Sequence, residues 1–189
     1  MKILVEATQL ASMRGEQILF TNLDISVGGG EIVLLRGRNG SGKTTLLRQL
    51  AGLSQPQAGR LQRFGAQHWI GHNHGLKAHE TPRLHLQHWA NVWGCSCDID
   101  AILQRLNLQR PADVPSRLLS AGQKRRTAIA RLLIEDRPVW LLDEPFNALD
   151  TQGRDLLHNL IATHVSAGGA VIAALHGETA MSATREISL

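Results

Sequence analysis

Residues 37–44 read Gly-Arg-Asn-Gly-Ser-Gly-Lys-Thr, and this stretch is the strongest indication of the fold. It matches the pattern G-x-x-x-x-G-K-[ST] at every fixed position. A compact apolar run, residues 32–35, comes before it, and leucines at helical spacing follow within residues 46–50. The sequence therefore predicts a buried strand, a phosphate-binding loop and a helix that begins near Lys43 and is closed by Gly52.

The chemistry of this loop follows from its residue types. Glycines let the backbone curl until successive N–H groups point at phosphate oxygens, and the helix N-terminus adds a favourable positive potential. The Lys43 ammonium suits the β- and γ-phosphates, and the Thr44 hydroxyl suits Mg²⁺. The alternative is a glycine turn without a nucleotide, which the complete motif disfavours. The candidate nucleotide-binding residues are Gly37, Arg38, Asn39, Gly40, Ser41, Gly42, Lys43, Thr44 and Thr45.

A second apolar run ends in two acids. Residues 139–142 read Val-Trp-Leu-Leu, and Asp143 and Glu144 follow directly. We expect Asp143 at the end of a buried strand, where its carboxylate holds Mg²⁺ through water. Glu144 is then placed to orient, or accept a proton from, the water that attacks the γ-phosphate. A solvated turn is the alternative, and the phosphate-binding loop elsewhere in the chain argues against it.

The rest of the chain alternates strands with helices, which predicts a parallel sheet covered by helices. We expect short N-terminal strands over 2–10, 17–20 and 23–27, and buried strands over 139–142 and 170–175. Further helices are expected to start at Pro82 (after a Thr81 cap), near Asp98, at Ser120 (running to about Asp136) and near Gln152. Residues from about 77 to 118 are expected to form a helical insertion between two strand-rich parts.

Composition limits the class of protein. The chain has 189 residues, of which 43% are hydrophobic and 19% charged, so we expect a folded domain rather than disorder. Its longest apolar stretch, residues 170–175, falls far short of the roughly 20 residues of a membrane span, and Glu6 interrupts any signal-peptide core. We therefore expect a cytosolic protein. The net charge of +4 is too small to identify a partner.

Residues 119–123, Leu-Ser-Ala-Gly-Gln, resemble the signature LSGGQ of the ABC transporter ATPases, with Ala121 in place of glycine. Ser120 can cap the helix that follows, and Gly122 permits close backbone approach to an anion. The resemblance implies that ATP is the nucleotide. It also implies that Leu119, Ser120, Ala121, Gly122 and Gln123 face the ATP bound by the opposite subunit of a homodimer.

Other motifs of that family can be matched to individual residues of this chain. Residues 147–150 resemble the D-loop, whose acid is Asp150, and His176 resembles the switch histidine that contacts the γ-phosphate. Asn73 stands where most relatives have the Q-loop glutamine and is a further candidate metal ligand, although it is one methylene shorter. The chain has no tyrosine, and Arg14 occupies the place of the aromatic residue that stacks on adenine. A guanidinium plane can also stack on a base.

Three residue clusters have ordinary interpretations. Six histidines lie between residues 68 and 88, and their spacing fits no standard zinc pattern, so we expect solvated side chains. The pair Trp89 and Trp93 is most simply core, with a partner-docking face as the alternative. Cys95 and Cys97 are too few for a disulfide scaffold, and metal binding is the less favoured alternative.

The resemblance covers essentially the whole chain and implies a fold class. We expect an α/β P-loop ABC ATPase core with an N-terminal antiparallel β portion, as one domain over residues 1–189. A helical subdomain of approximately residues 77–136 is inserted in the core. Catalysis is assigned to Lys43, Glu144 and His176, and the cofactor is Mg²⁺, held by Thr44 and Asp143.

Within the family, the chain is most similar to the ATP-binding subunits of heme exporters in cytochrome c maturation. The short chain, the signature, residues 70–72 and the block 143–146 carry this narrower resemblance. It implies ATP, integral membrane transporter subunits and, indirectly, a heme chaperone pathway as partners, at the cytoplasmic side of the bacterial inner membrane.

Other functions stay open at this point. One is a soluble ABC ATPase that acts on nucleic acid or ribosomes, and another is the ATPase of an importer or exporter for a different substrate. A regulatory nucleotide-binding module without turnover is disfavoured by Lys43, Asp143 and Glu144. No nucleic-acid partner is expected.

Overall fold

The computed structural model describes residues 2–175 and 181–189. The chain divides into two compact units. The first unit contains residues 1–71, 137–144 and 161–189, and the second contains residues 72–136 and 145–160. Within the described residues, no helix is both long and apolar enough to cross a membrane.

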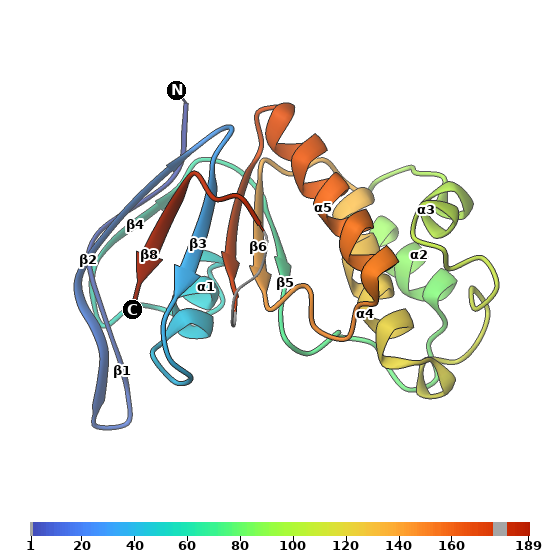
Figure 1. Cartoon of the computed structure of the whole chain (residues 1–189), viewed down its shortest axis with the longest axis horizontal. Helices are drawn as coiled ribbons and strands as arrows, with labels where there is room; N and C mark the ends of the chain where they lie inside the picture. Colours follow the sequence, from blue (N-terminus) through green and yellow to red (C-terminus); the bar gives the residue numbers. More distant parts are fainter. Residues whose placement is uncertain (1, 176–180) are drawn as a thin grey trace. The chain divides into compact units, whose positions relative to one another are not determined.

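The first unit begins with an antiparallel sheet in the strand order β2-β1-β4 (Figure 1). The strands are β1 (Ile3–Arg14), β2 (Gln17–Gly28) and β4 (Ala58–Arg63). The antiparallel N-terminal portion is therefore confirmed, but the expectation of separate strands over 17–20 and 23–27 was wrong. Asn22 adopts a positive φ of 51°, which asparagine tolerates, and the pairing register shifts there, so the polar break is a bulge inside one strand.

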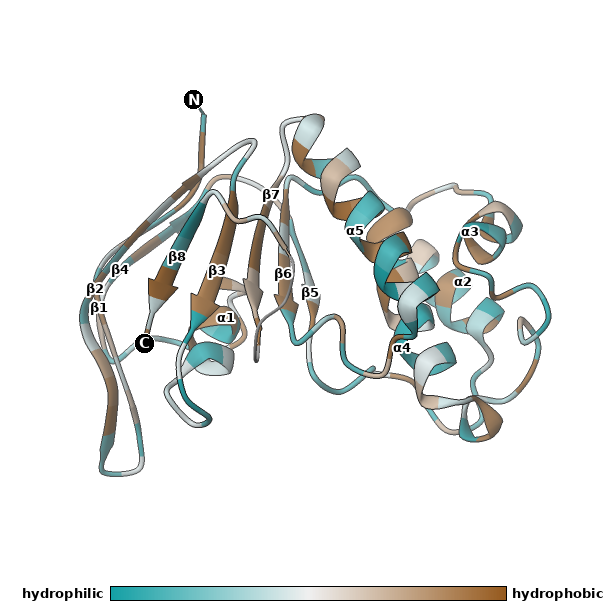
Figure 2. Cartoon of the chain, in the orientation of Figure 1, coloured by the Kyte–Doolittle hydropathy of each residue, from teal (hydrophilic) through white to brown (hydrophobic). Residues whose placement is uncertain are grey.

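A five-stranded sheet in the order β5-β6-β7-β3-β8 completes the first unit, and all its pairs are parallel. Figure 2 shows β3 and β6 as strongly apolar strands, as expected for a sheet buried on both faces. The sequence did not indicate β5 and β8, which are short and mixed in polarity, or β4, which is largely exposed. The strands are β3 (Ile32–Arg36), β5 (Gln67–Ile70), β6 (Val139–Asp143), β7 (Ala170–Ala174) and β8 (Arg185–Ser188).

The core of this unit forms around helix α1 (Lys43–Leu50). Leu46, Leu47 and Leu50 are fully buried, as their spacing predicted. They share one apolar cluster with residues of β1, β3, β6 and β7. The helix that follows the phosphate-binding loop is therefore held against both sheets.

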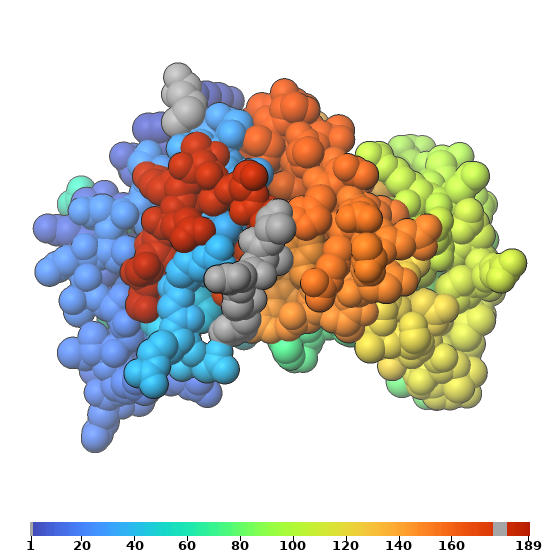
Figure 3. Space-filling view, in the orientation of Figure 1, coloured from blue at the N-terminus to red at the C-terminus, as the bar shows by residue number. Residues whose placement is uncertain are grey.

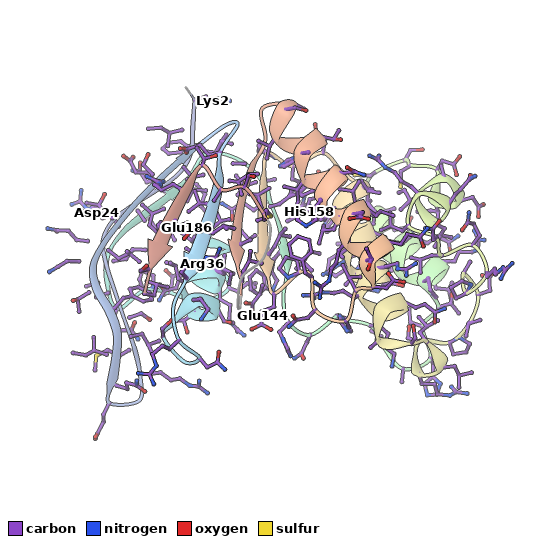
Figure 4. All side chains as sticks on the ribbon, in the orientation of Figure 1. Lys2, Asp24, Arg36, Glu144, His158 and Glu186 are labelled. Carbon is purple, nitrogen blue, oxygen red and sulfur yellow. The ribbon has the colours of Figure 1, made fainter. Side chains whose placement is uncertain are left out.

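The edge strand β8 lies beside β3 in the parallel sheet, and Figure 3 shows the red C-terminal atoms against the light-blue residues around 30–40. Arg36 on β3 and Glu186 on β8 form an ion pair with an N–O distance of 3.0 Å (Figure 4). Thr184 accepts the N–H of Ile32 at 3.0 Å. The strand that leads into the phosphate-binding loop is thus flanked on both sides.

The second unit is helical, with α2 in contact with both α3 and α4. The Thr81 cap and the first-turn Pro82 are confirmed, and α2 ends at Gly94, which adopts a left-handed conformation. The helix from Ser120 is shorter than expected, because it tightens into a 3₁₀ turn after Ala130. The elements are α2 (Pro82–Trp93), α3 (Ile99–Arg105), η1 (Ser116–Leu118), α4 (Ala121–Ala130) and η2 (Arg131–Leu133), while α5 (Thr151–Ser166) begins in this unit and ends in the first.

Candidate functional site

The phosphate-binding loop joins β3 to α1, as the sequence predicted. Gly42 precedes the helix with a φ of 108°, and a Cβ there would lie 3.0 Å from the Leu19 Cβ and 3.2 Å from a Phe20 ring atom. Only glycine combines this backbone conformation with such close packing against β2. The first N–H groups of α1 therefore begin directly at the loop, where a helix carries partial positive charge.

Lys43 is held within the loop. Its side chain is 6% exposed, and its Nζ donates to the Gly37 carbonyl at 2.7 Å and to the Arg38 carbonyl at 2.9 Å. An ammonium group has three N–H donors. Two of them anchor the side chain, and the third is left for a phosphate oxygen.

Asp143, the last residue of β6, is 3% exposed. Its Oδ2 accepts the hydroxyl of Thr44 at 2.9 Å, which joins α1 to the end of the buried strand. Among residues 2–175 and 181–189, no cluster of three or more His, Cys, Asp or Glu is arranged to hold a metal. One hydroxyl and one carboxylate fit Mg²⁺, which commonly takes one or two protein oxygens and completes its shell with water and phosphate.

Glu144 follows in a constrained backbone conformation. Its φ is 49°, a value that L residues adopt at a cost, and its N–H donates to the Ala174 carbonyl at 2.9 Å. Figure 4 shows Glu144 just beyond the end of β6. Glu144 therefore follows Asp143 directly in the chain, but it has a left-handed backbone conformation, whereas Asp143 belongs to strand β6.

One pocket of about 780 Å³ contains all of these groups. The β1–β2 hairpin contributes Met13, Arg14 and Leu19 to its lining. Its volume lies in the range of pockets that hold ligands the size of a nucleotide. The remaining lining residues are Asn39, Gly40, Gly42, Lys43, Thr44, Thr45, Arg48, Ser54, Asp143 and Glu144.

The signature segment lies in the second unit, at the start of α4. Ser120 is the N-cap, as predicted: its Oγ accepts the Gln123 N–H at 3.2 Å, and Gln123 Oε1 accepts the Ser120 N–H at 2.9 Å. This reciprocal pair is a capping box. Leu119 is buried, while Ser120 and Ala121 are exposed. The start of the helix is therefore fixed locally, with its first residues at the surface.

The same helix contacts the segment that carries Asp150. A Cβ on Gly122 would lie 3.0 Å from the Ala148 carbonyl oxygen, so glycine allows these two backbones to approach. Arg126 Nη2 donates to both carboxylate oxygens of Asp150, at 3.0 and 2.9 Å. The N–H of Gly153 and then the Arg126 charge hold the pKa of Asp150 below its ordinary value. Asp150 is therefore ionised and oriented within its own chain.

The structure thus brings the predicted site residues together in two groups. Loop residues 39, 40 and 42–45 line one pocket of the first unit together with Asp143 and Glu144, whereas Gly37, Arg38 and Ser41 are not part of that lining. The signature and Asp150 are tied together in the second unit. Asn73 is an exposed residue of the second unit. His176 lies outside the described residues.

The histidine-rich stretch differs from expectation. His68 is 2% exposed and His85 is 1% exposed, so the interpretation as solvated side chains was wrong for these two. Burial lowers the pKa of His85, although its Nδ1 lies 2.9 Å from a Glu80 carboxylate oxygen. Cys95 and Cys97 are free and half-buried.

The Trp89–Trp93 pair is half-buried rather than core. Their ring centroids lie 5.0 Å apart, and the Arg131 guanidinium lies over the Trp89 ring at 5.3 Å. Burial, with a contribution from Arg125, lowers the pKa of Arg131 to about 10.

Sequence reasoning missed Arg125. This side chain is 1% exposed and is the largest among those less than 2% exposed. Its Nε donates to the Pro145 carbonyl at 3.1 Å, immediately after Glu144. In the sequence it stands between Lys124 and Arg126, where a basic run is typical of a solvated helix face, so no local signal marked it.

A strand–loop–helix phosphate cradle, with a buried aspartate bonded to its threonine, defines a P-loop nucleoside triphosphatase. Residues 20–147 match the family described as ABC transporter, and the chain belongs to this family. A solved ATP-binding subunit of an ABC transporter superposes with a TM-score of 0.82 at 23% identity, over 92% of this chain and 79% of that one. This confirms the predicted fold class.

Two relatives that share one protein name are similar to this chain over nearly its whole length. The cytochrome c biogenesis ATP-binding export protein CcmA of Hyphomonas neptunium is 53% identical, over 98% of this chain and 96% of its own length. The protein of the same name from Rhodopseudomonas palustris (strain HaA2) is 39% identical, over 95% of this chain and 94% of its own length.

Proposed function

We propose that this chain is the ATP-hydrolysing subunit of an ABC transporter, and that the transporter is the heme exporter of cytochrome c biogenesis. The observation that carries the ATPase assignment is the shared pocket of the phosphate-binding loop, the Thr44–Asp143 pair and Glu144. The relatives named CcmA, similar over nearly the whole chain, support the transport system.

In the proposed reaction each residue has a distinct task. The N–H groups of residues 37–45 and the third donor of Lys43 bind the β- and γ-phosphates. Glu144 orients the attacking water and accepts its proton. Thr44 and Asp143 would hold Mg²⁺, which supplies neutralisation of phosphate charge. His176 would contact the γ-phosphate, and the contact of Asn73 to the metal would be water-mediated or lost.

We propose a homodimer in which Leu119, Ser120, Ala121, Gly122 and Gln123 face the ATP of the partner subunit. Closure of that dimer, with Asp150 at the link between the two sites, would drive integral membrane subunits. The helical subdomain of approximately residues 77–136, inserted in one ATP-binding domain, would connect the ATPase to those membrane subunits. The protein would then be peripheral, on the cytoplasmic side of the bacterial inner membrane.

The ATPase proposal is tested by Lys43→Ala, with Lys77→Ala as a matched control at an exposed lysine. Removing a principal electrostatic stabiliser costs about a hundredfold or more in turnover. Phosphate release should therefore fall by that factor in Lys43→Ala and stay unchanged in Lys77→Ala. Wild-type turnover in Lys43→Ala, at matched ATP affinity, would refute the assignment of the loop.

The transport proposal needs a cellular readout. In a bacterium whose own CcmA-type subunit has been deleted, the wild-type chain should restore covalently bound heme in c-type cytochromes, measured by heme staining. Lys43→Ala should not restore it. Failure of the wild-type chain, while it copurifies with the membrane subunits, would count against the heme-export assignment and leave the ATPase assignment standing.

A further inference from the structure

The backbone of Glu144 is held from both sides. On the N-terminal side its own N–H donates to the Ala174 carbonyl at 2.9 Å, inside the first unit. On the C-terminal side the next carbonyl, that of Pro145, accepts from Arg125 Nε at 3.1 Å, inside the second unit. Because Glu144 has a φ of 49°, its conformation persists only where its surroundings determine it.

Arg125 is a fully buried guanidinium group whose Nε donates to the Pro145 carbonyl. A guanidinium group is almost never fully buried unless it is paired, because it loses its hydration. A well-packed apolar side chain of similar size often stabilises a protein as well or better. A gain in stability alone does not favour a buried charge, and the Nε hydrogen bond of Arg125 ends at the turn after Glu144, so this bond points to a positioning task.

Two further contacts tie the same helix to the same segment. Gly122 lies against the Ala148 carbonyl, and Arg126 holds the Asp150 carboxylate. Phe146 is anchored as well, with its ring stacked on His158 at 4.6 Å between centroids. The start of α4 and residues 145–150 therefore form one locally fixed body.

We propose that Arg125 is a positioning residue for Glu144. Through the Pro145 carbonyl, it keeps the Glu144 backbone in the left-handed region and so places the carboxylate. Arg125 follows the signature by two residues on α4. It therefore also connects the turn after Glu144 in one ATP site with the helix start that, in the proposed homodimer, faces the ATP of the partner subunit. This inference rests on the proposed role of Glu144 in hydrolysis.

The test compares Arg125→Met and Arg125→Lys with Arg131→Gln as a matched control. Arg131 is the C-cap residue of the same helix, and its guanidinium lies over the Trp89 ring. An error of about 1 Å in a catalytic group can cost a hundredfold. Arg125→Met should therefore lower kcat at least tenfold with ATP affinity within threefold, while Arg125→Lys recovers part of the loss and Arg131→Gln keeps kcat within twofold.

A double-mutant cycle separates positioning from general damage. Single-turnover hydrolysis is measured for Arg125→Met, Glu144→Gln and the double variant, with the melting temperature recorded for each. If Arg125 acts through Glu144, its replacement has no further effect on the residual rate of Glu144→Gln. Equal rate losses in both backgrounds would overturn the proposal.

Two other results are informative in different ways. An unchanged rate in Glu144→Gln would overturn the proposed role of Glu144, and the inference with it, whereas additivity overturns the inference alone. If Arg125→Met does not fold, the same cycle is run with Arg125→Lys, which keeps the buried charge but lacks the planar Nε donor. Full kcat in that variant would contradict the proposal.

Discussion

The C-terminal end of helix α1 is capped by Arg63, which lies on strand β4 of the antiparallel sheet. Arg63 on β4 donates through Nε to the Leu50 carbonyl at 2.7 Å and through Nη2 to the Gln49 carbonyl at 2.5 Å. The last carbonyls of a helix lack partners within the helix and carry partial negative charge. We predict that Arg63→Ala destabilises the helix that positions Lys43 and Thr44.

The expected magnitude follows from these contacts. A hydrogen bond to a charged group contributes about 1.5–3 kcal/mol, and a cation at a helix C-terminus about 0.3–1 kcal/mol. Arg63 is an exposed residue, so water takes over part of both contributions. The net loss should be about 1–2 kcal/mol, or roughly 2–8 °C in melting temperature for a chain of this size.

Circular dichroism melts and guanidinium titrations of Arg63→Ala, Arg63→Lys and Arg60→Ala measure this loss. Arg60 lies on the same strand and is also exposed, so it controls for the lost charge. Arg63→Lys should be intermediate, because a lysine cannot reach both carbonyls with a rigid fork. Unfolding free energies of Arg63→Ala and Arg60→Ala within about 0.3 kcal/mol of each other, inside the usual scatter of surface changes, would refute the reasoning.

Four further predictions concern the site and pH. Glu144→Gln should form an ATP-stabilised dimer on size-exclusion chromatography with MgATP; a monomer both with and without purified membrane subunits would contradict the homodimer. Asn73→Gln should change basal ATPase activity by less than about tenfold, or 1.4 kcal/mol in barrier, and should act mainly on stimulation by those subunits. A collapse of basal turnover in Asn73→Ala would instead make Asn73 a direct catalytic ligand. Arg14→Ala should weaken ATP and GTP binding to similar extents, measured with fluorescent analogues, because a guanidinium plane stacks on any base; a loss confined to ATP would exclude stacking. Burial lowers the pKa of His85, so the folded chain keeps its ring neutral, the unfolded chain takes up the proton below about pH 6.5, and stability should fall as the pH drops through that range. Thermal melts of His85→Gln should show a flatter pH dependence than wild type, and an equal slope would refute the assignment to His85.

Local patterns predicted the parts of the fold that local physics determines. The glycine spacing of residues 37–44 located the phosphate-binding loop, and the apolar run before Asp143 placed that carboxylate at the end of a buried strand. Thr81 and Ser120 were identified as caps because their bonds close within three residues.

The missed features depend on contacts between distant segments. Arg63 and Arg125 look like surface residues in the sequence, and only the folded chain shows the carbonyls that they reach. His68 and His85 were misread for the same reason, since burial depends on which segments cover them. The strand β8 is mixed in polarity and is defined by its pairing with β3.

The order of strands in the parallel sheet also has a consequence for biosynthesis. β3 leads into the phosphate-binding loop and emerges early from the ribosome, yet both of its neighbours, β7 and β8, are made much later. One of the bonds that secure it, from Ile32 to Thr184, spans 152 residues. Pairing over such distances is slow, and an unpaired apolar strand invites aggregation. The nascent chain therefore carries an unfinished nucleotide site through most of its translation, and β3 is the segment for which we expect chaperone protection.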